Sequence, residues 1–315
     1  MRVAFVGKGG TGKSTLSTLF FLHLLSNDQK VLLFDADLNI HIPDLLGVSF
    51  PEEKSLSLTN NTAKIRKYLR GKSTFIRSID DFYKTTPPSN GVNLLTLEQT
   101  NPLLKECTEP YKQGYISVVG TYEKDEIGRS CYHTNLSILE NLLSFASLKE
   151  NEWIIADMVA GIDAFSNTFH KQFDALILII EPTQESVAVY RQYLSLATHA
   201  GIADRLLVVG NNVEDQDDLE FLKTAIQSSS FIGHLPHHRS LKKKRQRGEV
   251  LDTELLKTIG VELFNTIEKQ SRKMKIDPEQ RLKELHQLHL HYIQQDYVKN
   301  ASGDLSHQID KQYRF

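Results

Sequence analysis

The sequence predicts an α/β fold with a doubly wound, mostly parallel β-sheet. Short apolar runs bounded by turn residues recur along the chain, as expected for strands that are buried on both faces. Segments with the length and apolar spacing of helices separate these runs. This alternation is typical of parallel sheets covered by helices, in which ligands bind at the carboxyl ends of the strands.

The expected strands and helices follow one another along the chain. Strands are predicted at residues 3–6, 31–34, 153–156, 175–180 and 206–209. Helices are predicted at residues 16–25, 136–148, 186–200 and 217–226. The segment from about 48 to 130 is less regular, because it carries Pro87-Pro88 and Asn90-Gly91, and we expect one strand there at 92–97.

The last part of the chain differs in composition from the rest. After residue 260 it is rich in charged residues, Gln and His, and four apolar residues lie three or four positions apart, as on one helix face. These residues are Leu282, Leu285, Leu288 and Tyr292. We therefore predict a main domain over residues 1–260, with an irregular insertion at about 48–130, and a C-terminal helical extension over 261–315.

Composition and charge narrow the possible protein classes. The chain has 315 residues, enough for one large α/β domain with an appendage, and its formal net charge is -2. This charge argues against a surface that coats nucleic acid generally. The longest apolar runs, such as 175–180, are far shorter than the roughly 20 residues that cross a bilayer. With two cysteines and no signal segment, the sequence predicts a cytoplasmic protein without a transmembrane segment or a disulfide framework.

A glycine-rich loop directly after the first predicted strand carries the strongest functional signal. Residues 7–14 fit the phosphate-binding pattern G-x-x-x-x-G-K-[ST], with an additional lysine, Lys8, near its start. Glycines let successive backbone N–H groups point at a polyphosphate, which a Cβ would obstruct. Lys13 then reaches the β- and γ-phosphates, and Ser14 offers its hydroxyl to Mg²⁺. The residues expected to bind the nucleotide here are Gly9, Gly10, Thr11, Gly12, Lys13, Ser14 and Thr15.

Acidic residues end two further predicted strands and complete this site. Asp35 and Asp37 follow residues 31–34, and we expect Asp37 to orient a water for attack on the γ-phosphate. Asp157 ends the strand at 153–156 and is expected to hold Mg²⁺. Gly161 lies in the turn behind it, where its amide can sense the γ-phosphate.

These motifs, in their order over roughly residues 1–260, resemble the deviant-Walker ATPases of the MinD/ParA group. The resemblance implies that Lys8 crosses a dimer interface to the partner's phosphates, so that ATP joins two protomers and hydrolysis releases them. It supports Asp37 as the residue that orients water. It also implies that Asn211, in Val208-Val209-Gly210-Asn211-Asn212, reads the adenine, and that the turn containing Pro236 closes over the base.

Within that group, the chain most resembles the CooC-like branch, the accessory ATPases of nickel insertion into carbon monoxide dehydrogenase. The likeness lies in residues 157–163, in Glu181-Pro182-Thr183-Gln184-Glu185-Ser186 and in the Gly210-Asn211 turn. That branch carries a Cys-x-Cys pair, which joins two protomers around a metal, whereas this chain has Cys131-Tyr132-His133. One thiolate and one imidazole from each chain can form a four-ligand site for Ni²⁺ or Zn²⁺, while an ordinary structural role for Cys131 and His133 stays open.

Three functions remain open at this point. The first is an ATP-driven dimerisation switch that acts on a client protein and assists maturation of a metalloenzyme. The second is a positioning or partition ATPase that binds DNA or a membrane-associated partner, and the third is a regulatory nucleotide-binding module with little turnover. A basic cluster is the feature that DNA, RNA or an acidic partner would contact, although a solvated loop face is the interpretation that we prefer. This cluster comprises Arg239, Lys242, Lys243, Lys244, Arg245 and Arg247.

Overall fold

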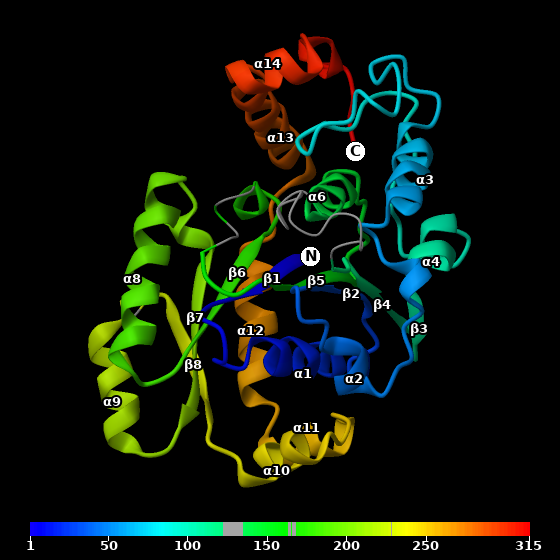
Figure 1. Cartoon of the computed structure of the whole chain (residues 1–315). Coiled ribbons are helices and arrows are strands. Elements are labelled where there is room, and N and C mark those ends of the chain that lie inside the picture. Colours follow the sequence, from blue (N-terminus) through cyan, green and yellow to red (C-terminus); the bar gives the residue numbers. More distant parts are fainter. Residues whose placement is uncertain (122–134, 163–164, 166–167, 228) are drawn as a thin grey trace. The chain divides into compact units, whose positions relative to one another are not determined.

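The apolar runs form a single eight-stranded sheet (Figure 1). The computed structural model describes residues 1–121, 135–162, 165, 168–227 and 229–315. The strand order is β3-β4-β2-β5-β1-β6-β7-β8. Parallel pairing joins β2 to β5, β5 to β1, β1 to β6, β6 to β7 and β7 to β8, whereas β3 and β4 are antiparallel. The predicted doubly wound, mostly parallel α/β fold is confirmed.

The chain forms two compact units. The first comprises Met1–Phe50, Glu109–Ser117 and Glu150–Lys275, and the second comprises Pro51–Thr108, Val118–Lys149 and Ile276–Phe315. The strands are β1 (Arg2–Val6), β2 (Lys30–Ala36), β3 (Glu109–Tyr111), β4 (Gly114–Val118), β5 (Glu152–Met158), β6 (Ala175–Ile180), β7 (Leu206–Val213) and β8 (Phe231–Pro236). All of them belong to the first unit except the last residue of β4.

Helices cover the sheet within the first unit. They are α1 (Lys13–Ser26), α2 (Ile42–Leu46), α8 (Gln184–His199), α9 (Gln216–Ala225), α10 (Arg239–Arg247), α11 (Thr253–Ile259) and α12 (Glu262–Lys273), with short 3-10 helices η3 (Phe169–Lys171) and η4 (Ala203–Arg205). In Figure 1, α8 contacts β6 and α9 contacts β7, while α1 contacts α2, α11 and β5. Because neighbours surround α1, every residue from Leu16 to Leu25 is buried.

One sheet face and the helices against it share a continuous apolar core. Alternate residues of β1, β2, β5, β6 and β7 join side chains of α1, α11 and α12 in this core. At its centre the ring of Phe20 lies 5.8 Å from that of Phe5 and 5.7 Å from that of Trp153. This packing fixes the start of α1, and therefore the loop that precedes it, against the carboxyl ends of β1 and β5.

The second unit consists mainly of helices. They are η1 (Glu52–Lys54), α3 (Thr59–Arg70), α4 (Pro102–Cys107), α6 (Ser137–Ser144), α13 (Pro278–Ile293), α14 (Asp296–Ser302) and η5 (Ser306–Gln308). Polar contacts tie the C-terminal segment to the insertion. The Asn90 backbone N–H and amide both donate to Asp310, at 2.9 and 2.7 Å, and His289 Nδ1 lies 3.1 Å from Thr85 Oγ1. The C-terminal helices therefore fold together with residues of the insertion.

The structure differs from the sequence predictions in three respects. The strand expected at 92–97 is wrong, because Leu95 alone pairs, with Ala146, and the N–H of Asn93 donates to Leu69 O instead. Strands β3 and β4, inside the expected insertion, were not anticipated. The boundary expected near residue 260 also does not coincide with the division of the chain, since α12 lies in the first unit and contacts β8. No helix among the described residues is sufficiently long and apolar to span a bilayer.

Candidate functional site

The glycine-rich loop connects β1 to α1 at the edge where the parallel strands end. Gly7 and Gly12 have φ values of 138° and 91°, which side-chain-bearing residues rarely adopt. A Cβ on Gly7 would lie 2.5 Å from the carbonyl oxygen of Ile179 in β6. Gly12 is the left-handed residue immediately before α1. Glycine at these two positions thus permits both the tight packing and the sharp entry into the helix.

Hydrogen bonds hold this loop in a closed ring. Lys8 O accepts from Thr11 Oγ1 at 2.9 Å and from Lys13 Nζ at 3.3 Å. Thr11 O accepts from Asn211 Nδ2, which comes from β7, at 2.8 Å. The N–H of Gly161 donates to Gly7 O at 3.0 Å. Asn211 and Gly161, from two separate sequence motifs, therefore both contact the glycine-rich loop and hold its backbone in place.

The ammonium group of Lys13 is largely removed from water. Lys13 is 5% exposed. Burial lowers the pKa of its ammonium group, and the negative charges of Asp157 and Asp37 partly offset this shift. Such a desolvated cation is stabilised by an additional anion. The position of Lys13 at the start of α1, where backbone N–H groups lack helical partners, favours a phosphate in that role.

Asp35 and Asp157 occupy matching positions on neighbouring strands, but their side chains have different environments. The register pairs the two residues across β2 and β5. Asp35 accepts hydrogen bonds from the N–H groups of His41, Ile42 and Asp37, at 2.8, 2.9 and 3.4 Å. Burial nevertheless raises the pKa of Asp35 to about 6. Asp35 therefore shapes the loop that leads from β2 into α2.

Asp157 is a buried carboxylate without such support. It has no exposed surface, and neither oxygen has a hydrogen-bond partner of good geometry among the described residues. Burial and the nearby charge of Asp35 raise the pKa of Asp157 well above its usual value, although the Ser14 hydroxyl and Lys13 oppose this shift. Unpaired carboxylate oxygens beside a serine hydroxyl are the donors that Mg²⁺ accepts. Asp157 and Ser14 are therefore the residues that would hold a magnesium ion.

Asp37 lies just beyond the end of β2 and is half-buried. Its Oδ1 accepts the Asn39 N–H at 3.1 Å. Unlike Asp35, it lines the open cavity in front of the glycine-rich loop. Its position is compatible with contact between its carboxylate and a water molecule in that cavity.

The cavity has a volume of about 830 Å³. It brings together most of the residues predicted to bind nucleotide, whereas Lys8, Thr11, Asp157, Gly161 and Pro236 are not among its lining residues. The predicted residues that line it are Gly9, Gly10, Gly12, Lys13, Ser14, Thr15, Asp37 and Asn211. Lys8 is exposed, and its side chain makes no hydrogen bond or ion pair with any described residue.

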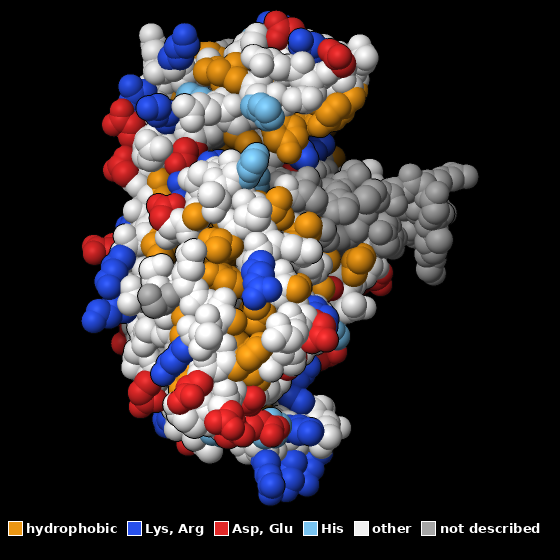
Figure 2. Space-filling view, turned by 90° about the vertical axis from the view of Figure 1, so that its left-hand side faces the viewer, with side chains coloured by type: hydrophobic (Ala, Val, Ile, Leu, Met, Phe, Trp, Pro, Cys, Tyr) orange, Lys and Arg blue, Asp and Glu red, His pale blue; other side chains and the backbone are white. Residues whose placement is uncertain are grey.

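Helix α10 supplies cavity residues that the sequence did not reveal as part of this site. Leu241, Lys242, Arg245 and Gln246 line the cavity, together with His41, Asn212 and the His237-His238 pair. Lys244 and Arg247 instead pair with Asp252 and Glu249, at 3.2 and 3.4 Å. Four of the six residues of the basic cluster, visible as the blue patch at the bottom of Figure 2, are thus divided between the cavity and local ion pairs. The three-residue spacing of Lys242 and Arg245 was the available signal.

The proposed transition-metal ligands Cys131 and His133 lie outside the described residues. Among the residues that are described, no group of three or more His, Cys, Asp or Glu side chains is placed to hold a metal ion. Cys107 is buried in the second unit, and burial raises the pKa of its thiol to about 12. Cys107 is therefore a core thiol and a poor source of thiolate.

Comparison with known proteins agrees with this geometry. Residues 3–251 match the model of the CobQ/CobB/MinD/ParA nucleotide binding domain. An uncharacterized ATP-binding protein of Methanocaldococcus jannaschii is 29% identical over 276 residues, covering 85% of this chain and 97% of that protein. The carbon monoxide dehydrogenase accessory protein CooC of Rhodospirillum rubrum is 22% identical, with coverages of 79% and 88%. The fold is similar to that of the septum site-determining protein MinD complexed with Mg-ADP from Pyrococcus horikoshii, with a TM-score of 0.53, 16% identity and coverages of 94% and 98%.

The unpaired state of Asp157 generates a stability prediction. Because the folded pKa of Asp157 is raised, its charge destabilises the metal-free protein increasingly as pH rises above the usual aspartate value near 4. Asp157→Asn should therefore stabilise the metal-free protein by about 1–2 kcal/mol at pH 7, and by much less at pH 4. Thermal unfolding in EDTA across this pH range measures the effect.

The matched control is Asp44→Asn, because Asp44 is exposed in α2. This control should change the melting temperature little at any pH. A melting temperature of Asp157→Asn that stays below that of the wild type across the whole range would contradict the assignment of an unfavourable buried charge.

Proposed function

The chain belongs to the CobQ/CobB/MinD/ParA family of nucleotide-binding domains, and from this we propose that it binds ATP with Mg²⁺ and hydrolyses the γ-phosphate. The observation that carries the proposal is the buried carboxylate of Asp157, which lies near Lys13 and Ser14. Neither of its oxygens has a hydrogen-bond partner of good geometry among the described residues. A polyphosphate and Mg²⁺ would supply the anion and the cation that these groups lack. The Mg-ADP complex of the MinD protein named above supports the same pair of ligands.

Residues of the loop and of two neighbouring strand ends have distinct roles in this proposal. Backbone N–H groups of Gly9, Gly10 and Gly12 would surround the phosphates, and Lys13 would contact the β- and γ-phosphates. Ser14 and Asp157 would hold Mg²⁺, which offsets negative charge that develops on the transferred phosphoryl group. Asp37 would orient the attacking water, because the carboxylate of Asp35 is already engaged by three backbone N–H groups.

Adenine recognition follows from the hydrogen bond that Asn211 already makes. Its Nδ2 donates to Thr11 O, so its Oδ1 is left as an acceptor for the exocyclic amino group of adenine. Asn211 would thus connect the base with the phosphate loop. Pro236 and His237 follow along the chain at the end of β8, where they would close the site over the base.

We further propose that ATP drives dimerisation through Lys8. The exposed position of Lys8, without a partner among the described residues, leaves its ammonium group available to a second protomer. An ammonium supplied across the interface would contact phosphate oxygens and stabilise the dimer only while ATP is present. Hydrolysis would then separate the protomers, so that the nucleotide controls the oligomeric state of the protein.

The switch would serve a client protein in the maturation of a metalloenzyme. The similarity to the carbon monoxide dehydrogenase accessory protein supports an accessory role. Ni²⁺ or Zn²⁺ would be the cargo if Cys131 and His133 supply the ligands. The partition alternative is less favoured, because two residues of the basic cluster face the nucleotide cavity and two others form ion pairs. A regulatory module would differ from this switch in having a negligible rate of ATP hydrolysis.

Asp37→Ala should slow turnover strongly while leaving ATP binding intact. The substitution removes the group that orients water, so the rate of phosphate release should fall about 100-fold or more. Affinity for ATP should change little, and ATP-bound dimers should accumulate. Asp44→Ala is the control, since Asp44 is exposed and does not line the cavity. A wild-type rate that is negligible and unaffected by Asp37→Ala would instead identify the regulatory module.

Lys8→Ala should separate binding from dimerisation. Because Lys8 would act on the partner's nucleotide, the variant should bind ATP with the wild-type dissociation constant but remain monomeric with ATP and Mg²⁺. Lys13→Ala should lose nucleotide binding itself, and Lys30→Ala, an exposed lysine at the start of β2, should behave as the wild type. Calorimetry and light scattering measure the two properties, and ATP-dependent dimers of Lys8→Ala would exclude the trans role.

Cys131→Ala tests the metal cargo. The ATP-bound wild type should retain about one Ni²⁺ or Zn²⁺ per dimer on equilibrium dialysis, because two thiolates and two imidazoles complete a four-ligand site. Cys131→Ala and His133→Ala should each lose this metal. Cys107→Ala should retain it, since its buried thiol has a pKa raised to about 12. Dimers that bind no metal, or metal bound equally by Cys131→Ala, would remove the metallochaperone role.

A further inference from the structure

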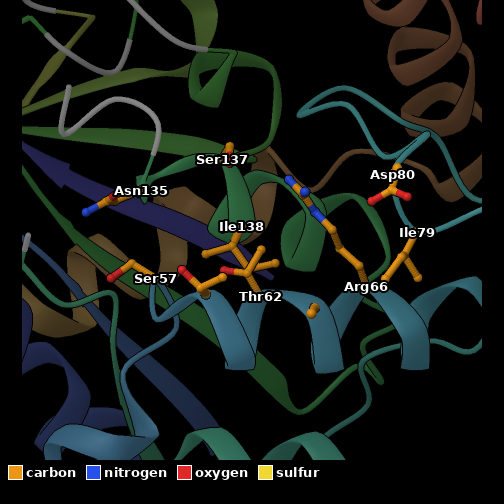
Figure 3. A pocket seen from close by; sticks show the side chains of 10 residues that line it. Ser57, Thr62, Arg66, Ile79, Asp80, Asn135, Ser137 and Ile138 are labelled. Atoms are coloured by element: carbon orange, nitrogen blue, oxygen red, sulfur yellow. The ribbon is translucent and has the colours of Figure 1, made fainter. Parts of the chain in front are cut away.

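A second, smaller pocket lies wholly within the second unit (Figure 3). It has a volume of about 280 Å³ and is formed mainly by one face of α3 and the start of α6. This volume suits a small metabolite and is too small for a nucleotide. The lining residues are Ser57, Thr59, Thr62, Ala63, Arg66, Ile79, Asp80, Asn135, Ser137 and Ile138.

Arg66 is the central charged group of this pocket. Thr59, Thr62 and Arg66 are spaced three and four residues apart, so they share one face of α3. Arg66 Nε donates to Asn141 Oδ1 at 3.3 Å, while Asn141 Nδ2 donates to Tyr83 O at 2.8 Å and Lys84 O at 3.3 Å. Asn141 is completely buried, so it fixes the guanidinium from the interior side.

The other side of the guanidinium is free to bind a ligand. Within the described part of the chain, its terminal nitrogens make no hydrogen bond, and no carboxylate lies within ion-pair distance. Burial lowers the pKa of Arg66, and the charge of Asp80 opposes this shift from further away. A half-buried guanidinium that is oriented but unpaired presents two parallel N–H donors, which match the two oxygens of a carboxylate.

Asp80 restricts which anion fits. Figure 3 shows Asp80 and Arg66 on the same side of the pocket, with Ser137 and Asn135 further along it. Asp80 is exposed, and its carboxylate forms no ion pair with any described residue. Its negative charge disfavours a dianion such as phosphate but attracts a cationic group on the same ligand. Ala63, Ile79 and Ile138 provide apolar surface for a short side chain.

We propose that this pocket binds a small zwitterion of the α-amino acid class. Arg66 pairs with the α-carboxylate through its two terminal nitrogens, and Asp80 attracts the α-ammonium group. Hydroxyls such as that of Ser137 add hydrogen bonds, and the apolar residues accept the side chain. The site is independent of the nucleotide cavity, because all its lining residues belong to the second unit.

Calorimetric titration with three probes tests the proposal. L-alanine, propionate and inorganic phosphate are added at millimolar concentrations to the full-length protein. Only heat that disappears in Arg66→Gln counts toward this pocket, since phosphate can also bind the glycine-rich loop. L-alanine should bind more tightly than propionate, and phosphate should give no Arg66-dependent heat. Arg66→Gln should weaken L-alanine binding about ten-fold or more.

Asp80→Asn and Lys67→Gln complete the experiment. Asp80→Asn should remove the preference for L-alanine over propionate, and because Asp80 is exposed this variant should fold normally. Lys67→Gln is the matched control, an exposed cation of α3 that does not line the pocket. The proposal is overturned by the absence of Arg66-dependent heat with L-alanine, by Arg66-dependent phosphate binding, or by an unchanged alanine preference in Asp80→Asn.

Discussion

The architecture of the nucleotide site depends on charge buried at the carboxyl ends of three adjacent strands. Asp35 and Asp157 are fully buried beside each other on β2 and β5, and Lys13 is nearly so at the end of the loop after β1. Burial raises the pKa of both carboxyl groups, the charge of Asp35 raises that of Asp157 further, and Lys13 only partly offsets the shift at Asp157. The protein alone therefore leaves buried negative charge without a sufficient positive partner, and a divalent cation would supply one. The continuous apolar core under α1 stabilises the fold that buries this charge.

The sequence predicted those parts of the fold and site that depend on local pattern. Apolar runs located the five central strands, since a strand buried on both faces must be apolar throughout. The glycine-rich loop was recognisable because close backbone packing, as at Gly7, excludes side chains. The prediction of a strand at 92–97 was wrong because apolar residues alone do not make a strand. Only Leu95 pairs, through an isolated bridge to Ala146. Pairing partners, as for β3 and β4, are set by tertiary structure and leave little trace in the local sequence.

Helix α10 illustrates the same limit within the site. Its basic residues suggested a nucleic-acid surface when considered as a cluster, but a helix separates neighbouring residues onto different faces. Lys242 and Arg245 line the cavity, whereas Lys244 and Arg247 meet acids within the same region of the chain. Burial lowers the pKa of Arg245 with no opposing carboxylate, so an anionic ligand would favour its charged form. The cavity therefore carries cationic groups on both α1 and α10, which the loop motif alone did not indicate.

The contact between Gly7 and Gly161 occupies the backbone donor that the proposed function assigns to the γ-phosphate. The Gly161 N–H donates to Gly7 O, and its own carbonyl accepts from Tyr193 Oη at 2.6 Å. A nucleotide that engages the Gly161 amide must replace the bond to Gly7. The bond from the Gly161 N–H to Gly7 O contributes about 1 kcal/mol, as is typical of a bond between neutral groups. A bond from the same N–H to a charged phosphate oxygen would be stronger. Under the proposed function, a γ-phosphate that accepts from the Gly161 N–H would therefore compete with Gly7 O for this donor, so the segment after β5 would differ between the two nucleotide states.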